Sequence, residues 1–343
     1  MRILIMRFSS IGDIVLTEPV SRLLKEEYPD STIDFLTKPQ FESVAKYFYG
    51  VDNIITGEDI SDLHKKLKDK SYDIVIDLHG KLRSMILKRL LKSKKVLTYK
   101  KHHILRRLLT KGIVNKQMPY TAEQYTKPLA KLNIELSTKD IIPSLNIPVN
   151  YTNPYVEELK KMSLEKRKTI AVFPGALHKT KQYPVEQLAE AINTLSVNEN
   201  YAFYLLGSKA EVELTESLQS LLRVKATNWC GRLSMEELIP VIGRFSLVIS
   251  NDSGPMHIAA ALKVKQVAIF GSTHPVLGFS PLNSNAIVVQ REMACRPCTL
   301  HGEAKCPKKH FNCMTKLHPE KVVEAFLKLM VDEGEAPLLD LGQ

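Results

Sequence analysis

The stretch Ile249-Ser-Asn-Asp-Ser-Gly-Pro-Met-His-Ile-Ala-Ala-Ala-Leu262 decides the fold class. It runs from the end of an apolar strand, through a small polar turn at Asp252, Ser253 and Gly254, directly into an alanine-rich helical segment. This order is typical of parallel α/β sheets, in which the free helix N–H groups at the carboxyl edge bind anions. Those N–H groups suit a pyrophosphate, whereas Asp252 suits sugar hydroxyls or a helix cap. His257 is either a phosphate or sugar ligand or a structural residue.

The same alternation of strand and helix occurs in both halves of the chain and predicts two parallel sheets. A length of 343 residues also favours two domains of about 150 residues each. The predicted strands are Ile3–Met6, Ile33–Leu36, Ile74–Asp77, Val96–Tyr99, Ile170–Phe173, Phe203–Leu206, Leu247–Ser250, Val267–Ile269 and Ala286–Val289. The predicted helices are Pro19–Tyr28, Ser61–Lys68, Arg83–Leu91, Ala122–Leu132, Pro184–Leu195, Glu211–Leu222, Met235–Ile242, Pro255–Leu262 and His318–Met330. We expect a linker at Ile141–Pro154 and a loose acidic tail after the last helix.

The positive charge is concentrated in the first half of the chain. The net charge is +11, and residues 1–150 hold 26 of the 48 basic side chains but 17 of the 37 acidic ones. No acidic residue lies between Asp77 and Glu123, where 13 Lys or Arg occur. Such a field attracts an anionic partner. Lys81 and Arg83, which follow a predicted strand, are candidates to hold acidic groups of a large substrate, although a solvated basic helix is the simpler reading.

A polar turn, Arg7-Phe-Ser-Ser-Ile-Gly-Asp13, follows the first predicted strand. It does not match the G-x-G-x-x-G fingerprint of dinucleotide binding. Gly12 permits a tight turn and close approach of a ligand. Asp13 then stands at the start of the next helix, either as a helix cap or as a general base that takes a proton from a hydroxyl nucleophile.

A second loop, Phe173-Pro-Gly-Ala-Leu-His-Lys-Thr-Lys-Gln-Tyr-Pro184, follows the first strand of the second half. Lys179 and Lys181 precede a helix, so ammonium and helix N–H groups can converge on a phosphate. The alternative is a solvated loop with incidental lysines, since the Walker pattern is absent.

Four cysteines lie close together in the sequence, in the pattern Cys295-x2-Cys298-x7-Cys306-x6-Cys313. They are candidates for a structural zinc or iron–sulfur site, or are packing or redox-labile thiols. Four thiolate ligands would leave no open catalytic position. Five cysteines in this length do not indicate a disulfide framework, and no apolar run is long enough for a signal peptide or a membrane span. We therefore expect a cytoplasmic protein.

Taken together, Arg7–Asp13, Pro174-Gly175-Ala176 with Lys181 and Tyr183-Pro184, and Asn251–His257 with Ala259-Ala260 resemble the signature segments of glycosyltransferase family nine, the heptosyltransferases of lipopolysaccharide core assembly. The resemblance implies a GT-B architecture of two Rossmann-like domains facing across a cleft. It further implies inverting transfer of a sugar, typically heptose from ADP-heptose, to a lipopolysaccharide core hydroxyl.

The resemblance also assigns roles to segments of the chain. Residues 1–150 are expected to bind acceptor, residues 151–317 to bind nucleotide-sugar, and residues 318–343 to form a helix that crosses back toward the first domain, plus the tail. The implied partners are the nucleotide-sugar, a phosphorylated glycolipid and the cytoplasmic face of the inner membrane, with no nucleic acid. No cofactor is expected for catalysis, and the chain contains no Asp-x-Asp pair to hold a divalent ion.

Carried over residue by residue, Asp13 matches the family's general base. The donor-binding positions that the resemblance implies are Gly175, Ala176, Lys181, Glu211, Asp252, Ser253, Gly254 and His257. The implied acceptor-binding positions are Ser10, Gly12, Lys81 and Arg83. The chain departs from some family members at Ala176 and Leu177, where two threonines can stand near the donor phosphates.

Two other classes of function remain open from the residues alone. A nucleotide-sugar epimerase or dehydrogenase would use a similar α/β layout, but the fingerprint after the first strand is missing. A nucleic-acid-binding protein would use the basic stretch, which holds few interleaved aromatic residues.

Overall fold

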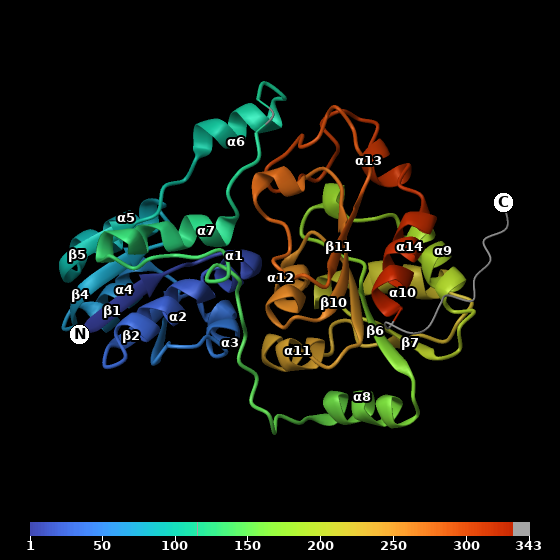
Figure 1. Ribbon diagram of the computed structural model, residues 1–343, viewed down its shortest axis with the longest axis horizontal. Helices are drawn as coiled ribbons and strands as arrows, with labels where there is room; N and C mark the ends of the chain where they lie inside the picture. The colour runs from blue at the N-terminus through green and yellow to red at the C-terminus, as the bar shows by residue number, and fades with distance from the viewer. Residues whose placement is uncertain (115, 332–343) are drawn as a thin grey trace. The chain divides into compact units, whose positions relative to one another are not determined.

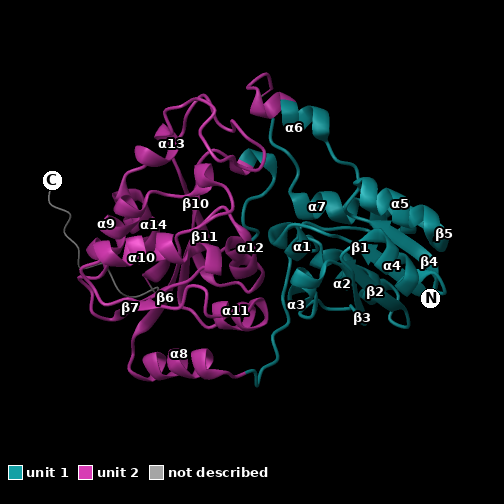
Figure 2. Ribbon diagram, turned by 180° about the vertical axis from the view of Figure 1, so that it is seen from behind, with its two compact units in different colours: residues 1–107, 116–151, 276–282 teal, residues 108–115, 152–275, 283–343 magenta. Residues whose placement is uncertain are grey.

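The computed structural model describes residues 1–114 and 116–331, and the predicted acidic tail lies outside them. The chain forms two compact units, coloured separately in Figure 2. Unit 1 comprises residues 1–107, 116–151 and 276–282, and unit 2 comprises residues 108–115, 152–275 and 283–343. Each unit is built on one parallel sheet, so the predicted fold class of two Rossmann-like α/β domains is confirmed. Among the described residues, no helix is long and apolar enough to cross a membrane.

The sheet of unit 1 has five parallel strands in the order β3-β2-β1-β4-β5 (Figure 1). The strands are β1 Arg2–Met6, β2 Thr32–Thr37, β3 Asn53–Thr56, β4 Ser71–Asp77 and β5 Lys92–Thr98. Its helices are α1 Ile11–Val15, α2 Glu18–Glu27, α3 Glu42–Ala45, α4 Ile60–Leu67, α5 Leu82–Leu90, α6 His103–Thr110 and α7 Thr121–Thr126, with 3-10 turns at Pro39–Phe41 and Lys127–Leu132. The first residues of α6 belong to unit 1 and the last to unit 2. Fully buried apolar side chains of β1, β4 and α5 form much of one core cluster.

The sheet of unit 2 has six parallel strands in the order β11-β10-β9-β6-β7-β8. The strands are β6 Lys168–Phe173, β7 Tyr201–Leu205, β8 Thr227–Asn228, β9 Leu247–Asn251, β10 Lys265–Phe270 and β11 Ala286–Gln290. Its helices are α8 Pro154–Leu164, α9 Val185–Leu195, α10 Val212–Leu221, α11 Met235–Ile242, α12 Gly254–Ala261, α13 Asn312–Thr315 and α14 Pro319–Met330, with 3-10 turns at Lys179–Lys181, Lys209–Glu211 and Pro275–Leu277.

The last helix is part of the core of unit 2. Helix α14 packs on α9, β10 and β11, and its apolar side chains Val322, Val323 and Phe326 are buried in the core cluster of that unit. Burying these side chains removes apolar surface from water, which stabilises the folded state by about 25 cal/mol for each Å² buried. The expected crossing of residues 318–343 toward the first domain stays a prediction.

All nine predicted strands are present, with bounds that differ by a few residues. The strands β3 and β8 were missed because they are short and partly exposed. The predicted helix at Ala122–Leu132 is instead α7 followed by a 3-10 turn. Pro128 explains the change, because proline lacks the N–H that would continue the α-helical ladder. Helix α8 begins at Pro154, where the predicted linker ends.

Two short segments belong to a different unit from their neighbours in the sequence: residues 108–115 belong to unit 2 and residues 276–282 belong to unit 1. Within unit 1, Val276 accepts a hydrogen bond from the Met118 N–H at 2.9 Å, and Gly278 accepts one from the Thr121 N–H at 2.8 Å. The guanidinium of Arg106 lies 5.4 Å from the centre of the Phe279 ring in the same unit, a cation–π distance. Unit 1 is therefore completed by residues from late in the chain.

Glu18 is a fully buried carboxyl group in the first turn of α2. Its Oε2 accepts the Ser144 N–H at 2.9 Å, and its Oε1 lies 3.3 Å from Nε of Arg22. Burial outweighs these interactions and raises the pKa of Glu18 to about 7. The folded protein therefore binds a proton here that the unfolded chain releases above its ordinary pKa of 4.5.

This shift predicts that the Glu18 carboxyl lowers the free energy of unfolding as the pH rises from about 4.5 through 7. Over this range the folded state holds a proton that the unfolded chain has already released, and the folded state must give it up. Glu18→Gln should remove this dependence and raise the free energy of unfolding at pH 8 by about 1 to 2 kcal/mol. Urea unfolding of both proteins at pH 5, 6, 7 and 8 measures the difference. Glu26→Gln, a half-exposed partner of the same Arg22, is the control and should change little. An identical pH dependence in wild type and Glu18→Gln would contradict the assignment.

Candidate functional site

The strand order of unit 1 reverses between β1 and β4, which places the loops after these two strands side by side at the carboxyl edge of the sheet. In open α/β sheets ligands bind at this switch point. Ser10 follows β1 at the start of α1, which contains Gly12 and Asp13, and Lys81 follows β4 at the start of α5, which contains Arg83. The sheet thus brings the predicted catalytic residue and the predicted acceptor-binding residues to one edge of unit 1.

Asp13 is held by four donors. Its Oδ2 lies 2.9 Å from a guanidinium nitrogen of Arg7 and accepts hydrogen bonds from the N–H and the hydroxyl of Ser10, at 3.1 and 2.9 Å. Its Oδ1 accepts the hydroxyl of Tyr125 at 2.7 Å. Ser10 is the N-cap residue of α1, and Asp13 closes the capping box. The N-cap is therefore Ser10, so the capping alternative for Asp13 is wrong, although the Asp13 carboxylate accepts the Ser10 N–H from the third helical position. The Asp13 side chain remains 17% exposed.

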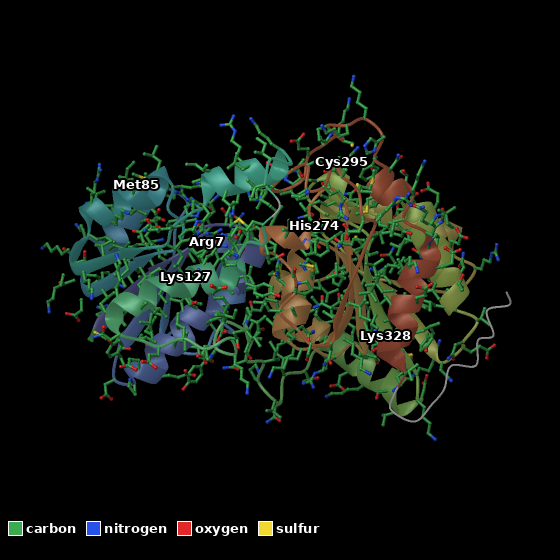
Figure 3. All side chains as sticks on the ribbon, turned by 45° about the horizontal axis from the view of Figure 1, so that its top comes forward. Arg7, Met85, Lys127, His274, Cys295 and Lys328 are labelled. Atoms are coloured by element: carbon green, nitrogen blue, oxygen red, sulfur yellow. The ribbon has the colours of Figure 1, made fainter. Side chains whose placement is uncertain are left out.

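The surroundings of Asp13 keep it ionised. Burial by itself would raise its pKa, but the Arg7 charge and the hydrogen bonds from Ser10 and Tyr125 outweigh burial and hold the pKa well below the usual range. The carboxylate is thus in its proton-accepting form across the neutral pH range. Arg7 (Figure 3) is itself fixed, because its other nitrogens donate to the carbonyls of Ser9 and Leu78, each at 2.6 Å.

Further cations surround Asp13. Lys101 donates from Nζ to the Gly80 carbonyl at 3.0 Å, and burial together with the charges of Arg7 and Lys81 lowers its pKa to about 8. Burial and then the Arg7, Lys101 and Lys81 charges also lower the pKa of the neighbouring His79 to about 3, so this imidazole is neutral at pH 7. Burial is the largest cause of both shifts, and the smaller contributions of the cation charges indicate that Arg7, Lys81 and Lys101 lie near one another.

The predicted acceptor-binding residues differ in their exposure and in the contacts that they already make. Lys81 is exposed at the N-cap of α5, whereas Arg83 is partly buried, donates to the carbonyl of Glu58, and lies 5.5 Å from the centre of the Phe8 ring. Arg83 is thus already engaged inside unit 1. Gly12 is buried in α1 next to Asp13.

The strand order of unit 2 reverses between β6 and β9, which forms a second switch point. Lys181 follows β6 and Asp252 follows β9, and Nζ of Lys181 lies 2.8 Å from Oδ2 of Asp252. The same oxygen accepts the Thr273 hydroxyl at 2.6 Å. Burial by itself would raise the pKa of Asp252, but the Lys181 charge and these hydrogen bonds lower it. Asp252 therefore anchors the lysine. The N-cap of α12 is its neighbour Ser253, so the capping alternative for Asp252 is wrong.

Hydrogen bonds from Asn251 hold the loop after β6. Its Nδ2 donates to the carbonyls of Pro174 and Gly175, at 2.8 and 3.3 Å, and its Oδ1 accepts the Tyr183 N–H at 3.0 Å. Gly175 packs directly on Glu211, because a Cβ atom added to Gly175 would lie 1.8 Å from Oε1 of Glu211. Only glycine leaves room for that carboxylate.

The remaining predicted donor-binding residues of unit 2 are Ala176, Glu211, Gly254 and His257. Oε2 of Glu211 accepts the N–H and the hydroxyl of Ser208, at 2.7 and 2.8 Å. Gly254 is the first residue of α12, and His257 is buried one turn further along the helix. Ala176 is buried, and its carbonyl accepts Nε2 of Gln182 at 2.8 Å.

The four clustered cysteines are neighbours in space. Burial, and then the charges of the other three thiols, raises the pKa of Cys298 to about 11. Within the described ranges 1–114 and 116–331, however, no three or more His, Cys, Asp or Glu side chains form a group that could hold a metal ion. The structure therefore does not assemble Cys295, Cys298, Cys306 and Cys313 (Cys295 is labelled in Figure 3) into a ligand set, and the predicted structural metal is not confirmed.

Three residues of these sites were not predicted from the sequence to be catalytic or binding residues: Tyr125, Lys101 and Thr273. Tyr125 lies 112 positions from Asp13, and Thr273 lies 21 positions from Asp252. Lys101 was hidden in a run of basic residues, where only its burial distinguishes it from its neighbours.

Comparison with known proteins gives one consistent answer. Residues 60–309 match the model of glycosyltransferase family 9 (heptosyltransferase). The lipooligosaccharide heptosyltransferase 2 of Campylobacter jejuni is 30% identical over 328 residues, which cover 93% of this chain and 95% of the relative. The solved structure of the Escherichia coli ADP-heptose lipopolysaccharide heptosyltransferase II has a TM-score of 0.74 at 21% identity, covering 96% and 98% of the two chains. An Escherichia coli heptosyltransferase solved with ADP has a TM-score of 0.65 at 19% identity, covering 96% and 100%. At these identities the two structures establish the fold alone.

The ion pair between Lys181 and Asp252 predicts that substitutions of these two residues have strongly coupled effects on the free energy of unfolding. Lys181→Met leaves the Asp252 carboxylate buried without its cation and should lower the free energy of unfolding by about 3 kcal/mol. Adding Asp252→Asn should restore at least half of that loss, as urea unfolding of the single and double variants would measure. The exposed pair Glu157–Lys160, at 2.8 Å, is the matched control, with a coupling below about 0.5 kcal/mol. Equal coupling in both pairs would contradict the anchoring role of Asp252.

Proposed function

The chain belongs to glycosyltransferase family 9, the heptosyltransferases, and we propose that it transfers heptose from ADP-heptose to a hydroxyl of the phosphorylated lipopolysaccharide core, with inversion at the anomeric carbon. Membership of this family makes it a glycosyltransferase and decides against the epimerase, dehydrogenase and nucleic-acid-binding alternatives. The observation that carries the proposal is the ionised Asp13 carboxylate, which lies among cations at the switch point of unit 1.

Unit 1 is proposed to bind the acceptor. Burial, and then the charges of Arg7 and Lys81, lower the pKa of Lys101, and a phosphorylated acceptor would offset that repulsion between cations. No acidic residue lies from Leu78 to Ala122, and the carboxylates that act on Lys101 are Asp77 and Asp13. Ser10 and Gly12, beside the carboxylate, would contact the acceptor sugar through a hydroxyl and a close backbone approach.

Asp13 is the proposed general base. The acceptor hydroxyl attacks the anomeric carbon and its proton passes to a carboxylate oxygen of Asp13, while the bond from the anomeric carbon to the diphosphate oxygen breaks on the opposite face. A low pKa makes Asp13 a weak base for a free hydroxyl. As the new carbon–oxygen bond forms, however, the attacking oxygen becomes strongly acidic, so the proton transfers late and a weak, permanently ionised base is sufficient.

Unit 2 is proposed to bind the donor. Lys181 and the N–H groups that begin α12 at Gly254 would stabilise the charge that develops on the leaving diphosphate. Asp252 would position Lys181 through the 2.8 Å contact, and Glu211, with its carboxylate at Gly175, would accept hydrogen bonds from the ribose hydroxyls. His257 would complete the same turn as a phosphate or sugar ligand.

The proposed transfer uses no cofactor, since the residues named above supply the base and the charge stabilisation. A structural metal at the four cysteines stays a separate prediction about the loop that holds them. Metal analysis of the purified protein tests it, and one zinc or iron per chain would support it. We further propose that the protein works in the cytoplasm, peripherally at the inner membrane, where a lipid-anchored acceptor would be presented.

Asp13→Asn tests the proposed base. The amide keeps the size of the side chain but cannot take the proton, so turnover should fall at least about 1000-fold while ADP binding stays within about twofold. Radiolabelled transfer and calorimetric ADP titration measure the two quantities. Asp59→Asn, which changes an exposed N-cap carboxylate of α4 in the same unit, is the matched control and should retain full activity. Retained turnover in Asp13→Asn would remove Asp13 from the role.

Lys101 predicts the alkaline behaviour of acceptor use. With a pKa of about 8 it loses its charge as the pH rises through 8, so kcat/KM for the acceptor should fall there while ADP binding does not. Lys101→Gln should lower kcat/KM about tenfold at pH 7 and abolish the alkaline fall. The exposed neighbour Lys100, changed to Gln, should keep the wild-type profile. An alkaline fall that persists in Lys101→Gln would assign it to another group.

A further inference from the structure

Helix α5 of unit 1 presents apolar side chains to solvent. Leu82, Met85 and Leu90 are 71%, 42% and 45% exposed, and Met85 lies at the surface of the unit in Figure 3. The opposite side of the same helix carries Leu87, which is fully buried in the core cluster of unit 1. Because positions three or four apart share one side of a helix, Leu82 and Met85 form a continuous outward stripe that the core does not use.

Exposed cations continue this stripe. Arg89 lies one helical turn beyond Met85, and Lys92 begins β5, the edge strand of the sheet. A hydrogen bond of 3.1 Å from Nζ of Lys88 to the Thr98 hydroxyl ties α5 to β5. Further along β5, Val96 is 42% exposed and Lys95 is also exposed. We name Leu82, Met85, Arg89, Leu90 and Lys92 the α5 face.

The sequence around the α5 face contains no acidic residue from Leu78 to Ala122. The face therefore combines side chains that gain by leaving water with cations that no neighbouring carboxylate in the sequence neutralises. That combination is typical of helices lying in the interface of an anionic membrane, with apolar side chains among the acyl chains and Lys or Arg at the headgroups. A nucleic acid backbone would use the cations but offers nothing to an exposed leucine or methionine.

We propose that the α5 face docks unit 1 on the surface of an anionic phospholipid bilayer. Leu82 and Met85 enter the headgroup boundary, and Arg89 and Lys92 contact lipid phosphates. Each cation near such a surface contributes about 1 kcal/mol, equivalent to about a fivefold gain in affinity, so two cations and two apolar side chains give reversible binding. This inference rests on the proposed peripheral location but not on the transfer reaction, because lipid binding is measurable without either substrate.

Sedimentation of the full chain with phosphatidylglycerol vesicles, and with phosphatidylcholine vesicles, tests the proposal. We expect binding to phosphatidylglycerol that weakens with salt and little binding to phosphatidylcholine. Leu82→Ser combined with Met85→Ser should weaken binding about tenfold at every salt concentration. Arg89→Ser combined with Lys92→Ser should weaken it about 25-fold at low salt and less at high salt.

The matched control is Leu164→Ser combined with Val197→Ser, which changes two apolar residues of unit 2 that are 86% and 76% exposed. It should bind vesicles like wild type. All variants should transfer sugar to a delipidated, water-soluble acceptor at the wild-type rate, whereas the α5 variants should be slower with the acceptor embedded in vesicles. Absence of phosphatidylglycerol binding by wild type, or equal binding by wild type and the α5 variants, would overturn the proposal. Failed transfer to either acceptor with intact vesicle binding would count against the proposed reaction alone.

Discussion

Parallel pairing of the central strands is the constraint on which the rest of the structure depends. In unit 1 it places β1 beside β4, and in unit 2 it places β6 beside β9. All carboxyl ends in a parallel sheet lie at one edge, so the loops that follow these strands meet there whatever their distance in the sequence. In unit 1 Arg7, which follows β1, donates to the carbonyl of Leu78, which follows β4, and in unit 2 Lys181 and Asp252 form an ion pair.

At each switch point a carboxylate is paired with a cation, but the two pairs differ in what they leave available. Oδ2 of Asp252 is taken by Lys181 and Thr273 in a buried setting, so this carboxylate serves the lysine. Asp13 also accepts hydrogen bonds through both oxygens, yet its side chain remains partly exposed, and the charges of Arg7 and Lys81 act on the nearby Lys101. The two sites therefore differ in the exposure of the carboxylate and in the cations that lie near it.

Much of the fold could be predicted because the spacing of apolar residues and the residue types in turns are local properties of the sequence. The strands before Asp13 and Asp252, and the glycine at 175, are visible as an apolar run followed by small polar residues. Packing decided other features. The last helix buries Phe326 in the core of unit 2, and in the described part of the chain the four cysteines lie near one another without forming a ligand set. Residue spacing predicts neither arrangement, because both depend on which surfaces come together on folding.

The sequence by itself determined two α/β domains, the polar turns that follow their strands, the excess of positive charge in the first half, and the resemblance to a family. These follow from residue type and order. Only the tertiary structure decided that Tyr125 donates to Asp13, that Thr273 shares the oxygen of Asp252 bound by Lys181, and that burial and neighbouring charges lower the pKa of Lys101. It also decided that α5 turns Leu82 and Met85 to solvent. Hydrogen bonds, burial and charge repulsion act through space, and they depend on distances that exist only once the chain has folded.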